Sequence, residues 1–468
     1  MNPLPLLELG ILFYFLAMNG YQLTFLARSY FAMRRYMNSV DWDEMETLFG
    51  TQHYKPISLL CPVYNEAAGV VGSVSSLLAL RYPETQVIVV NDGSTDDSLE
   101  LLIKAFKLRP SHRVVRKGIA TKPVRNVYES LYVLNLVVVD KENGGKADAL
   151  NCALNLARYP LVCCMDGDSL LENDALLRAV RPFLDTPNTM ACSGVIRPLN
   201  GCHVTPNGIR GIFLPKNWLP RFQIVEYLRA FLYGRVGLAS FKMLFIVSGA
   251  FGIFRRDLLE EIGGFKTSTV GEDFEAILRL HRHLREKRQP FNIAMVPDPI
   301  CWTEVPEHFK TLRRQRNRWQ RGLMETLWSH RRLFLNPRYG SLGLISMPFF
   351  VTFEALGPLV ELTGYVLFAC YLFQGGIDLP FASLFLLVAI FLGLLNSIAA
   401  VLLEVNGGHR YQGLKAFLLL LLTAILENFG YRQLTVFWRL TGIVDFLRGR
   451  SGWGRMQRTG ATSGAGTV

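Results

Sequence analysis

The sequence predicts an α/β domain with a mainly parallel sheet, combined with α-helical membrane segments. Two observations predict this fold class. Half of the 468 residues are hydrophobic, the mean hydropathy is +0.22 and only 19% of the residues are charged, a composition that favours membrane segments. Between residues 55 and 335, however, short apolar runs alternate with helical periodicity. That alternation is typical of a parallel sheet with helices on both faces.

The first apolar segment, Leu6 to Ala27, is long enough to cross a bilayer. Acidic Glu8 lies near its start, without a basic region before it or a small-residue cleavage site after it, so it is interpreted as a retained anchor rather than a signal peptide. Arg28, Arg34 and Arg35 follow it, and positive charge favours the cytoplasmic side. We therefore expect an integral plasma (inner) membrane protein whose central domain is cytoplasmic.

Three further apolar stretches lie at Leu344–Phe373, Leu379–Leu403 and about Leu414–Leu440. The last contains Glu427 and Arg432, and a single crossing there would leave a basic tail outside, so we favour a helical hairpin or a re-entrant segment. The expected domains are an N-terminal membrane helix (1–30), a cytoplasmic domain with interfacial helices (31–335), C-terminal membrane or interfacial helices (336–447) and a basic cytoplasmic tail, partly disordered (448–468).

Polar residues interrupt these C-terminal apolar stretches. They are Glu354, Glu361, Asn396, Glu404 and Glu427. Such groups are costly in lipid and face either a cavity or a partner. Two interpretations stay open, because these side chains could line a conduit for a polar polymer or form hydrogen bonds between packed helices.

The net charge of +12 does not indicate a nucleic-acid partner. The basic residues concentrate beside membrane segments and in one helical stretch, where lipid and phosphorylated ligands account for them. Zinc-finger spacing and basic-aromatic nucleic-acid modules are absent from the sequence. The eight cysteines form no CxxC pair, which predicts buried, reduced thiols in a cytosolic domain.

Three strand-like runs end in polar residues: ISLLCPVYNE, TQVIVVNDGS and YPLVCCMDGD. Ligands gather at the carboxyl ends of such strands. Asp166 and Asp168 are two residues apart, so an extended backbone points both carboxylates to one face. Hard oxygen ligands of this kind suit Mg²⁺ or Mn²⁺. Alternatively, Asp168 or Ser169 caps a following helix.

Other candidate residues stand at loop ends and helix starts. Asp92 follows a buried strand and could bind a base or ribose, or could simply be a turn aspartate before Gly93. In NGGKADALN, paired glycines and Lys146 at a helix start could converge on phosphate. Glu272 and Asp273 begin another helical pattern, where a carboxylate could serve as a general base or only favour the helix N-terminus.

The motif QRNRW places Gln315, Arg318 and Trp319 at i, i+3 and i+4, on one helical face. A guanidinium suits a diphosphate, and an indole suits stacking on a sugar ring. The alternative is a basic helix lying on the lipid surface.

These motifs occur in the order PVYNE, VVNDGSTDDS, GGKADALN, DGD, GED and QRNRW, with apolar segments before and after. In that order they resemble the membrane-embedded, processive family-two glycosyltransferases: the cellulose, chitin, hyaluronan and poly-N-acetylglucosamine synthases. The resemblance covers essentially the whole chain. It implies a GT-A fold with a mixed, mainly parallel sheet. Gly271 stands where the family usually has threonine, which leaves the neighbouring carboxylates unchanged.

The resemblance also implies a role for each motif residue. Asp273 would be the catalytic base, and Asp168 with Asp166 would bind Mg²⁺ or Mn²⁺. The residues implied to bind the nucleotide sugar are Pro62, Tyr64, Glu66, Asp92, Lys146, Asp166 and Arg318. Those implied to bind the acceptor are Gln315, Trp319, Glu272, Ser248 and Gly249.

The activity implied is that of an inverting hexosyltransferase. It would polymerise a β-linked polysaccharide from UDP-glucose or UDP-N-acetylglucosamine and secrete it through its own membrane helices. Its partners would be the donor, the growing polymer, the bilayer and possible accessory export or regulatory subunits. One alternative is a non-processive transferase that adds a single sugar to a lipid or lipid-linked acceptor. Another is a transporter or a non-catalytic carbohydrate receptor.

Overall fold

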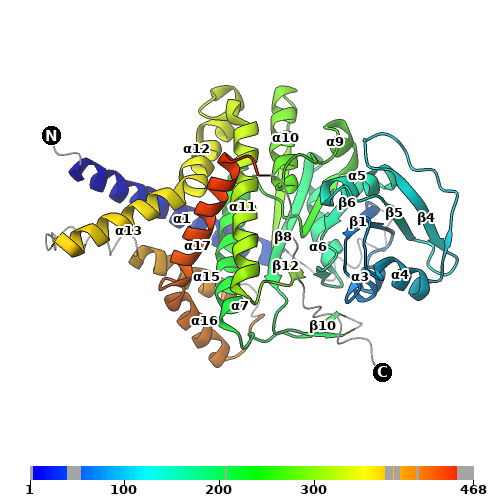
Figure 1. Cartoon of the computed structure of the whole chain (residues 1–468), viewed down its shortest axis with the longest axis horizontal. Helices are drawn as coiled ribbons and strands as arrows, with labels where there is room; N and C mark the ends of the chain where they lie inside the picture. Colours follow the sequence, from blue (N-terminus) through cyan, green and yellow to red (C-terminus); the bar gives the residue numbers. More distant parts are fainter. Residues whose placement is uncertain are drawn as a thin grey trace. The chain divides into compact units, whose positions relative to one another are not determined.

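The computed structural model describes residues 4–39, 54–205, 208–374, 383, 390–406 and 410–450 (Figure 1). The chain divides into two compact units. Among the described residues, an α/β unit takes its residues from the ranges 35–215 and 244–305, and a helical unit takes its residues from the ranges 4–34, 216–243 and 306–450. The expected domain boundaries remain a prediction, although 216–243 and 306–335 group with the helical unit in this division.

A ten-stranded sheet forms the centre of the α/β unit. Its spatial order is β3-β4-β5-β2-β1-β6-β11-β8-β12-β7. The strands are β1 (Ile57–Val63), β2 (Thr85–Asn91), β3 (Leu108–Pro110), β4 (Val124–Ser130), β5 (Leu136–Lys141), β6 (Leu161–Met165), β7 (Leu170–Leu171), β8 (Thr189–Pro198), β11 (Phe251–Arg255) and β12 (Asn292–Thr303); a separate ribbon joins β9 (His203–Thr205) to β10 (Gly208–Gly211). The pairings give β3, β5, β2, β1, β6, β8 and β12 one direction and β4, β11 and β7 the other. The sheet is mixed and mainly parallel, as predicted.

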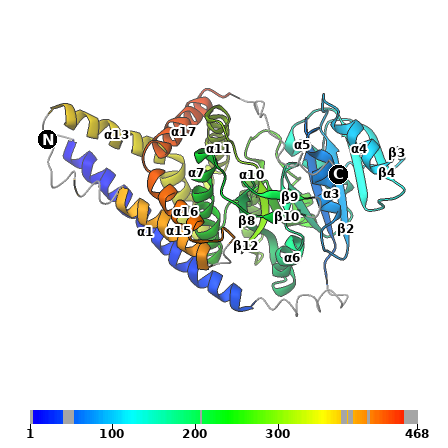
Figure 2. The ribbon, with the colours of Figure 1, turned by 90° about the horizontal axis from the view of Figure 1, so that it is seen from below.

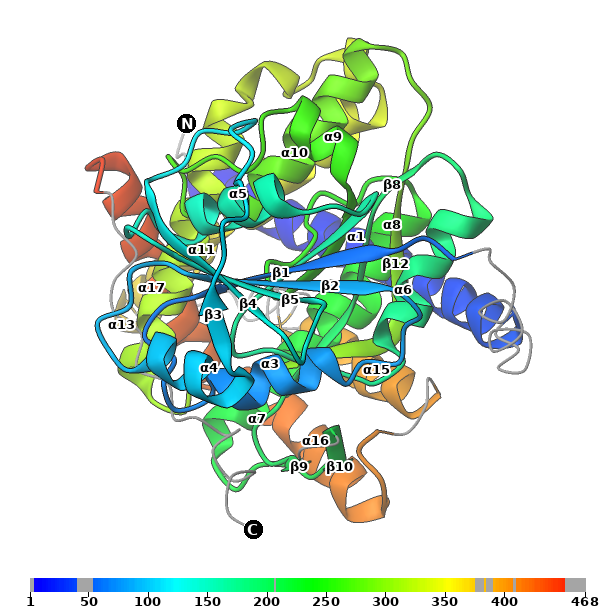
Figure 3. The same ribbon diagram turned by 90° about the vertical axis from the view of Figure 1, so that its right-hand side faces the viewer.

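The three strand-like runs of the sequence form the middle of this sheet. β1 lies between β2 and β6 and is parallel to both. Their apolar residues are almost completely buried, because helices cover both faces of the sheet. Figure 3 shows α5 (Lys146–Leu156), α9 (Arg256–Glu261) and α10 (Glu272–Glu286) on one face, and α3 (Val70–Leu78) and α4 (Ser98–Phe106) on the other.

The helix-cap interpretation of the aspartate pair is wrong. The next helix, α6 (Ala175–Asp185), begins with Asp174 as its N-cap, six residues beyond Asp168. In between, β7 pairs with the end of β12, Leu170 opposite Trp302. Sheet pairing and burial of the two leucines of β7 therefore displace the helix start along the chain.

The prediction of buried, reduced thiols holds for six of the eight cysteines. All eight cysteines are free, and six of them are buried in the α/β unit. Cys202 is half-buried and Cys370 is exposed. Burial raises the pKa of Cys61 and Cys152 to about 12, so these thiols stay protonated at neutral pH.

The described part of the helical unit consists mainly of helices. They are α1 (Leu4–Ser39, of which the last residues belong to the α/β unit), α7 (Trp218–Tyr227), η1 (Leu228–Arg235), α8 (Val236–Ser240), α11 (Phe309–Ser329), η2 (Arg331–Leu333), η3 (Pro337–Tyr339), η4 (Leu342–Ser346), α12 (Met347–Phe349), η5 (Phe350–Ala355), α13 (Gly357–Gln374), α15 (Leu392–Asn406), α16 (Leu414–Leu426) and α17 (Tyr431–Leu447). Figures 1 and 2 both show α17 lying beside α11.

Among the described residues, one helix, at Leu6–Ser39, is long and apolar enough to cross a membrane. Two bent pairs pass the same test only if each is one span: Leu342–Ala355 with Gly357–Tyr371, bent by 43°, and Leu414–Leu426 with Tyr431–Leu447, bent by 56°. The second bend lies at the predicted interruption near Glu427. Residues 379–382 and 384–389 of the predicted stretch Leu379–Leu403 lie outside the described residues, and its part from Leu392 onward belongs to α15.

The polar residues of the apolar helices contact one another. Arg432 forms an ion pair with Glu361 at 3.2 Å, and Arg439 lies 3.5 Å from Glu354. Glu427 pairs with Arg229 and accepts a hydrogen bond from Ser397 at 2.7 Å. Asn396 donates to Asn19 and Gln22 of α1. These contacts favour helix packing over conduit lining for these side chains.

The segment Trp218–Arg235 is helical and packs against other helices of the helical unit. It forms α7 followed by the π-helical η1. Most of its apolar side chains are buried, because α15 and α16 pack against it.

Candidate active site

The loops after β1 and β2 leave the sheet at the same edge, because the strands are parallel and in register. Backbone amides of the first loop donate hydrogen bonds to side chains of the second. The Asn65 and Glu66 amides donate to Ser94 Oγ at 3.0 Å and Ser98 Oγ at 2.9 Å, and the Ala67 amide donates to Asp96 Oδ2 at 3.0 Å. The loop after β1 is thus held in place by the loop after β2.

Asp92 holds the glycine turn that precedes α5. Its carboxylate is buried and accepts hydrogen bonds from the Gly144 amide at 3.0 Å and the Gly145 amide at 2.7 Å. Gly93 next to it has φ +68°, and a Cβ there would lie 2.9 Å from the Asn143 nitrogen, so only glycine fits. The structure therefore gives Asp92 an internal role, and its predicted contact with uridine stays a prediction.

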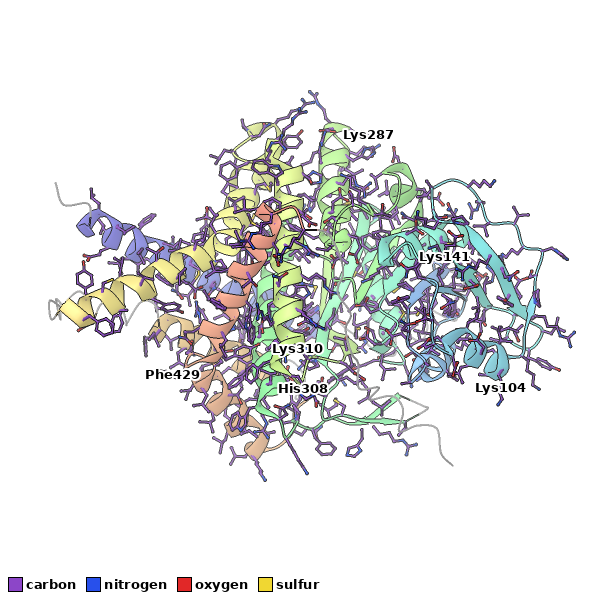
Figure 4. All side chains as sticks on the ribbon, in the orientation of Figure 1. Lys104, Lys141, Lys287, His308, Lys310 and Phe429 are labelled. Carbon is purple, nitrogen blue, oxygen red and sulfur yellow. The ribbon has the colours of Figure 1, made fainter. Side chains whose placement is uncertain are left out.

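Lys141, at the end of β5, was not among the predicted site residues. Its ammonium lies 2.6 Å from Asp92 Oδ1 and 2.6 Å from Asp148 Oδ1, and its side chain has no exposed surface. Burial lowers the pKa of Lys141, but hydrogen bonds to Asp148 and Asp92 raise it above its ordinary value. Figure 4 labels this residue between β5 and α5. A lysine at the end of a strand that begins with four apolar residues is the sequence signal that could have revealed it.

We expect Lys141→Met to destabilise the α/β unit and weaken donor binding. Removing the ammonium leaves two carboxylates buried without their cation, a loss of about 3 kcal/mol. The apparent Tm in detergent should then fall by about 5–10 °C. Thermal unfolding and calorimetric titration with UDP measure the two effects.

Lys104→Met is the matched control, because Lys104 is exposed on α4 (Figure 4), and it should leave both quantities unchanged. Adding Asp92→Asn and Asp148→Asn to Lys141→Met should restore part of the lost Tm, because the buried negative charge is then removed as well. An unchanged Tm in the single variant would contradict the role of Lys141.

Lys146, the first residue of α5, connects the aspartate pair to α10. Its ammonium lies 2.6 Å from Asp166 Oδ1 and 3.2 Å from Glu272 Oε1, and it donates to the Gly249 carbonyl at 3.2 Å. Burial lowers the pKa of Lys146, but the carboxylates of Asp166, Glu272 and Asp273 raise it well above its ordinary value. Burial raises the pKa of Glu272 more than Lys146 lowers it. Lys146 therefore remains a cation in this site.

Asp273 is held in one orientation at the start of α10. The Gly249 amide donates to its Oδ2 at 2.8 Å, and the Phe274 amide donates to its Oδ1 at 2.8 Å. A Cβ at Gly249 would lie 2.6 Å from the Lys146 nitrogen, so the absence of a side chain permits this approach. A continuous chain of contacts thus runs from Asp166 through Lys146 and Gly249 to Asp273.

Asp166 and Asp168 fit a hard divalent cation. Both side chains are half-buried, and Gly167 between them packs against the Pro62 carbonyl. The described residues contain no group of three or more His, Cys, Asp or Glu side chains that could hold a metal. Two carboxylates, with water and phosphate as further ligands, are a typical arrangement for Mg²⁺ in phosphoryl-substrate sites.

Four further residues of the α/β unit were predicted to belong to the site. Tyr64 is 48% exposed. Glu66 is half-buried in the same loop, and Pro62 is half-buried near the end of β1. Ser248 precedes Gly249, and its Oγ accepts a 3.4 Å hydrogen bond from the Ala250 amide.

The QRNRW motif lies on α11 in the helical unit. Gln315 is buried, whereas the Trp319 indole is 44% exposed. The Arg316 guanidinium lies over this indole, 4.4 Å from the ring centroid. Arg318 is half-buried. The helical spacing on which the motif prediction depended is confirmed.

A family model described as glycosyl transferase family group 2 matches residues 161–426, more than half of the chain. The chain belongs to this family. A second model, glycosyl transferase family 2, matches residues 58–263, which include the aspartate pair and the glycine turn. The predicted resemblance and the predicted glycosyltransferase class are confirmed.

Curated relatives in this glycosyltransferase family are named poly-beta-1,6-N-acetyl-D-glucosamine synthases. The protein from Staphylococcus epidermidis is 28% identical over 283 residues, 59% of this chain and 58% of its own length. That from Staphylococcus aureus strain COL is 28% identical over 275 residues, 58% of this chain and 55% of its own length. The matches span little more than half of these relatives.

A solved structure with a similar fold is the mannosyltransferase PcManGT from Pyrobaculum calidifontis, in complex with GDP-Man and Mn²⁺. It covers 94% of this glycosyltransferase and 100% of its own chain, with a TM-score of 0.52 and 19% sequence identity. The predicted GT-A fold class is confirmed.

Proposed function

We propose that this chain is an inverting, metal-dependent hexosyltransferase that polymerises a β-linked polysaccharide from UDP-glucose or UDP-N-acetylglucosamine. The observation that carries the proposal is the chain of contacts Asp166–Lys146–Gly249–Asp273. It links a candidate diphosphate-binding group to a candidate base, the two functions that glycosyl transfer requires. The names of the curated relatives favour N-acetylglucosamine as the sugar.

On the donor side, Lys146 and the backbone amides at the start of α5 would bind the diphosphate. Asp166 and Asp168 would hold Mg²⁺ or Mn²⁺, which when bound supplies positive charge to offset the negative charge of the departing nucleoside diphosphate. Lys146 adds a second positive charge at the same place, since it contacts Asp166 directly. A fixed cation needs no rearrangement as charge develops on the leaving group.

On the acceptor side, Asp273 would take the proton from the attacking hydroxyl. The acceptor oxygen then forms a bond to the anomeric carbon while the bond from that carbon to the UDP oxygen breaks. A single in-line displacement converts an α-linked donor into a β-linked product. The two amides that donate to Asp273 fix the orientation of its carboxylate, so the side chain need not change rotamer for this step. Gln315, Arg318 and Trp319 are the residues proposed for the acceptor sugar and diphosphate.

The test uses inverted membrane vesicles that contain the full chain, supplied with single UDP-sugars and Mg²⁺ or Mn²⁺. We expect UDP release with one donor, a polymer with β-linkages, and part of that polymer inside the vesicle lumen. A product one sugar longer than its lipid acceptor would establish the non-processive alternative. Binding without UDP release would indicate a receptor or transporter, α-linkages would overturn inversion, and a product wholly outside the lumen would overturn secretion.

A further inference from the structure

Arg316 lies inside the QRNRW motif but has no assigned role. Its side chain is buried, with 3% of the residue exposed. Its Nη2 lies 2.7 Å from Glu226 Oε2, and the Tyr431 hydroxyl donates to the same Glu226 oxygen at 2.8 Å. These three residues belong to α11, α7 and α17, so an ion pair and a hydrogen bond that share one Glu226 oxygen connect three helices of the helical unit.

The same guanidinium also covers one face of Trp319. Its central carbon lies 4.4 Å from the indole centroid, a distance typical of a cation–π contact. Arg316 and Trp319 are three residues apart on α11, so this contact follows from the helix itself. Because 44% of Trp319 is exposed, part of the indole remains accessible while the Arg316 guanidinium packs against one ring face.

Stability alone does not account for an arginine here. Within the part of the chain that the structure describes, Nε and Nη1 of Arg316 have no hydrogen-bond partner and are buried. Buried nitrogens without acceptors are unfavourable, and an apolar side chain of similar size often replaces a buried ion pair without loss. Arginine, unlike lysine, offers a planar face to an aromatic ring.

We propose that Arg316 is a positioning residue that holds the Trp319 indole for stacking on the acceptor sugar. Glu226 and Tyr431 hold the guanidinium, and the guanidinium holds the ring. A ring fixed before the acceptor arrives loses less conformational freedom on binding. The link to the acceptor rests on the proposed function, whereas the positioning of Trp319 does not.

The first measurement is independent of activity. The chain is labelled with 5-fluorotryptophan, and Trp319→Phe identifies the fluorine resonance of Trp319 in the detergent-solubilised protein. We expect Arg316→Met to broaden or split that resonance and to make it more accessible to a soluble paramagnetic agent. Arg313→Met, an exposed arginine on the same helix, is the matched control and should not change it. An unchanged Trp319 resonance in Arg316→Met would overturn the positioning role.

The second measurement is kinetic and separates the acceptor from the donor. With a short oligosaccharide acceptor, Arg316→Met should raise the acceptor KM by about 10-fold and shorten the polymer, as expected for loss of one stacking contact. UDP affinity should change by less than about 2-fold, because a residue that acts only on acceptor binding should leave donor binding intact. Arg316→Lys should fold like the wild type, but its acceptor KM should stay above the wild-type value, because lysine lacks the planar face of the guanidinium.

Each remaining outcome separates the two proposals. A changed Trp319 resonance with an unchanged acceptor KM would remove the link to the acceptor while leaving the positioning role. Equal increases in the KM for donor and acceptor, also seen with Glu226→Gln, would show that the ion pair acts only on the fold and would overturn the proposal. A wild-type chain that elongates no sugar acceptor would refute the proposed function, and the resonance would still test the positioning.

Discussion

Asp273→Asn should lower the turnover number by about 100-fold or more, the usual contribution of a positioned general base. Asparagine can keep the hydrogen bond from the Gly249 amide through its carbonyl oxygen and loses the one from the Phe274 amide, so most of the local structure should survive. It cannot take a proton from the acceptor hydroxyl at neutral pH. UDP release in a coupled assay measures the loss, and calorimetric titration with UDP should show affinity within about 2-fold of wild type.

Asp185→Asn is the matched control for this substitution. Asp185 ends α6, its side chain is 60% exposed, and its ion pair with Arg181 lies at the surface, so the change should leave the turnover number intact. If Asp273→Asn retained most of the activity, Asp273 would not be the base. The neighbouring carboxylate of Glu272 would then become the candidate, although it is already paired with Lys146.

Removing the divalent cation should have the second largest effect. We expect EDTA to lower the turnover number by about 100-fold or more, and Mg²⁺ or Mn²⁺ to restore it, because the cation offsets charge on the leaving diphosphate. Asp168→Asn should show the same loss and should not recover when either cation is added. Electron paramagnetic resonance of Mn²⁺, in the presence of UDP, measures binding separately from activity.

Asp185→Asn again serves as the control and should bind Mn²⁺ as the wild type does. Full activity in EDTA would contradict the proposed metal dependence. Normal Mn²⁺ binding by Asp168→Asn would contradict the assignment of Asp168 as a ligand while leaving the metal itself in place.

Several features of this protein followed directly from local sequence patterns. The strands β1, β2 and β6 were predictable because each is a short, continuous apolar run that a two-sided sheet buries. The helices α5 and α10 were predictable from their periodicity. Because parallel strands bring their carboxyl ends to one edge, the aspartates that follow these strands were expected at a common site.

Other features depended on contacts between distant segments. The buried cation at Lys141 joins Asp92 and Asp148, and only folding brings β2, β5 and α5 together around it. α6 begins later in the chain than the sequence predicted, because β7 pairs with β12 before the helix starts. In the helical unit, Glu361 forms an ion pair with Arg432 and Glu427 forms one with Arg229. No spacing in the sequence indicates these pairs.

The sequence by itself determined the fold class, the family and the identity of the motif residues, because these depend on residue type and on spacing within one strand or helix. Only the tertiary structure decided which charged groups neutralise one another. Burial makes an unpaired charge expensive, so each buried carboxylate must meet a cation. Which cation it meets is decided by the packing of elements that lie far apart along the chain.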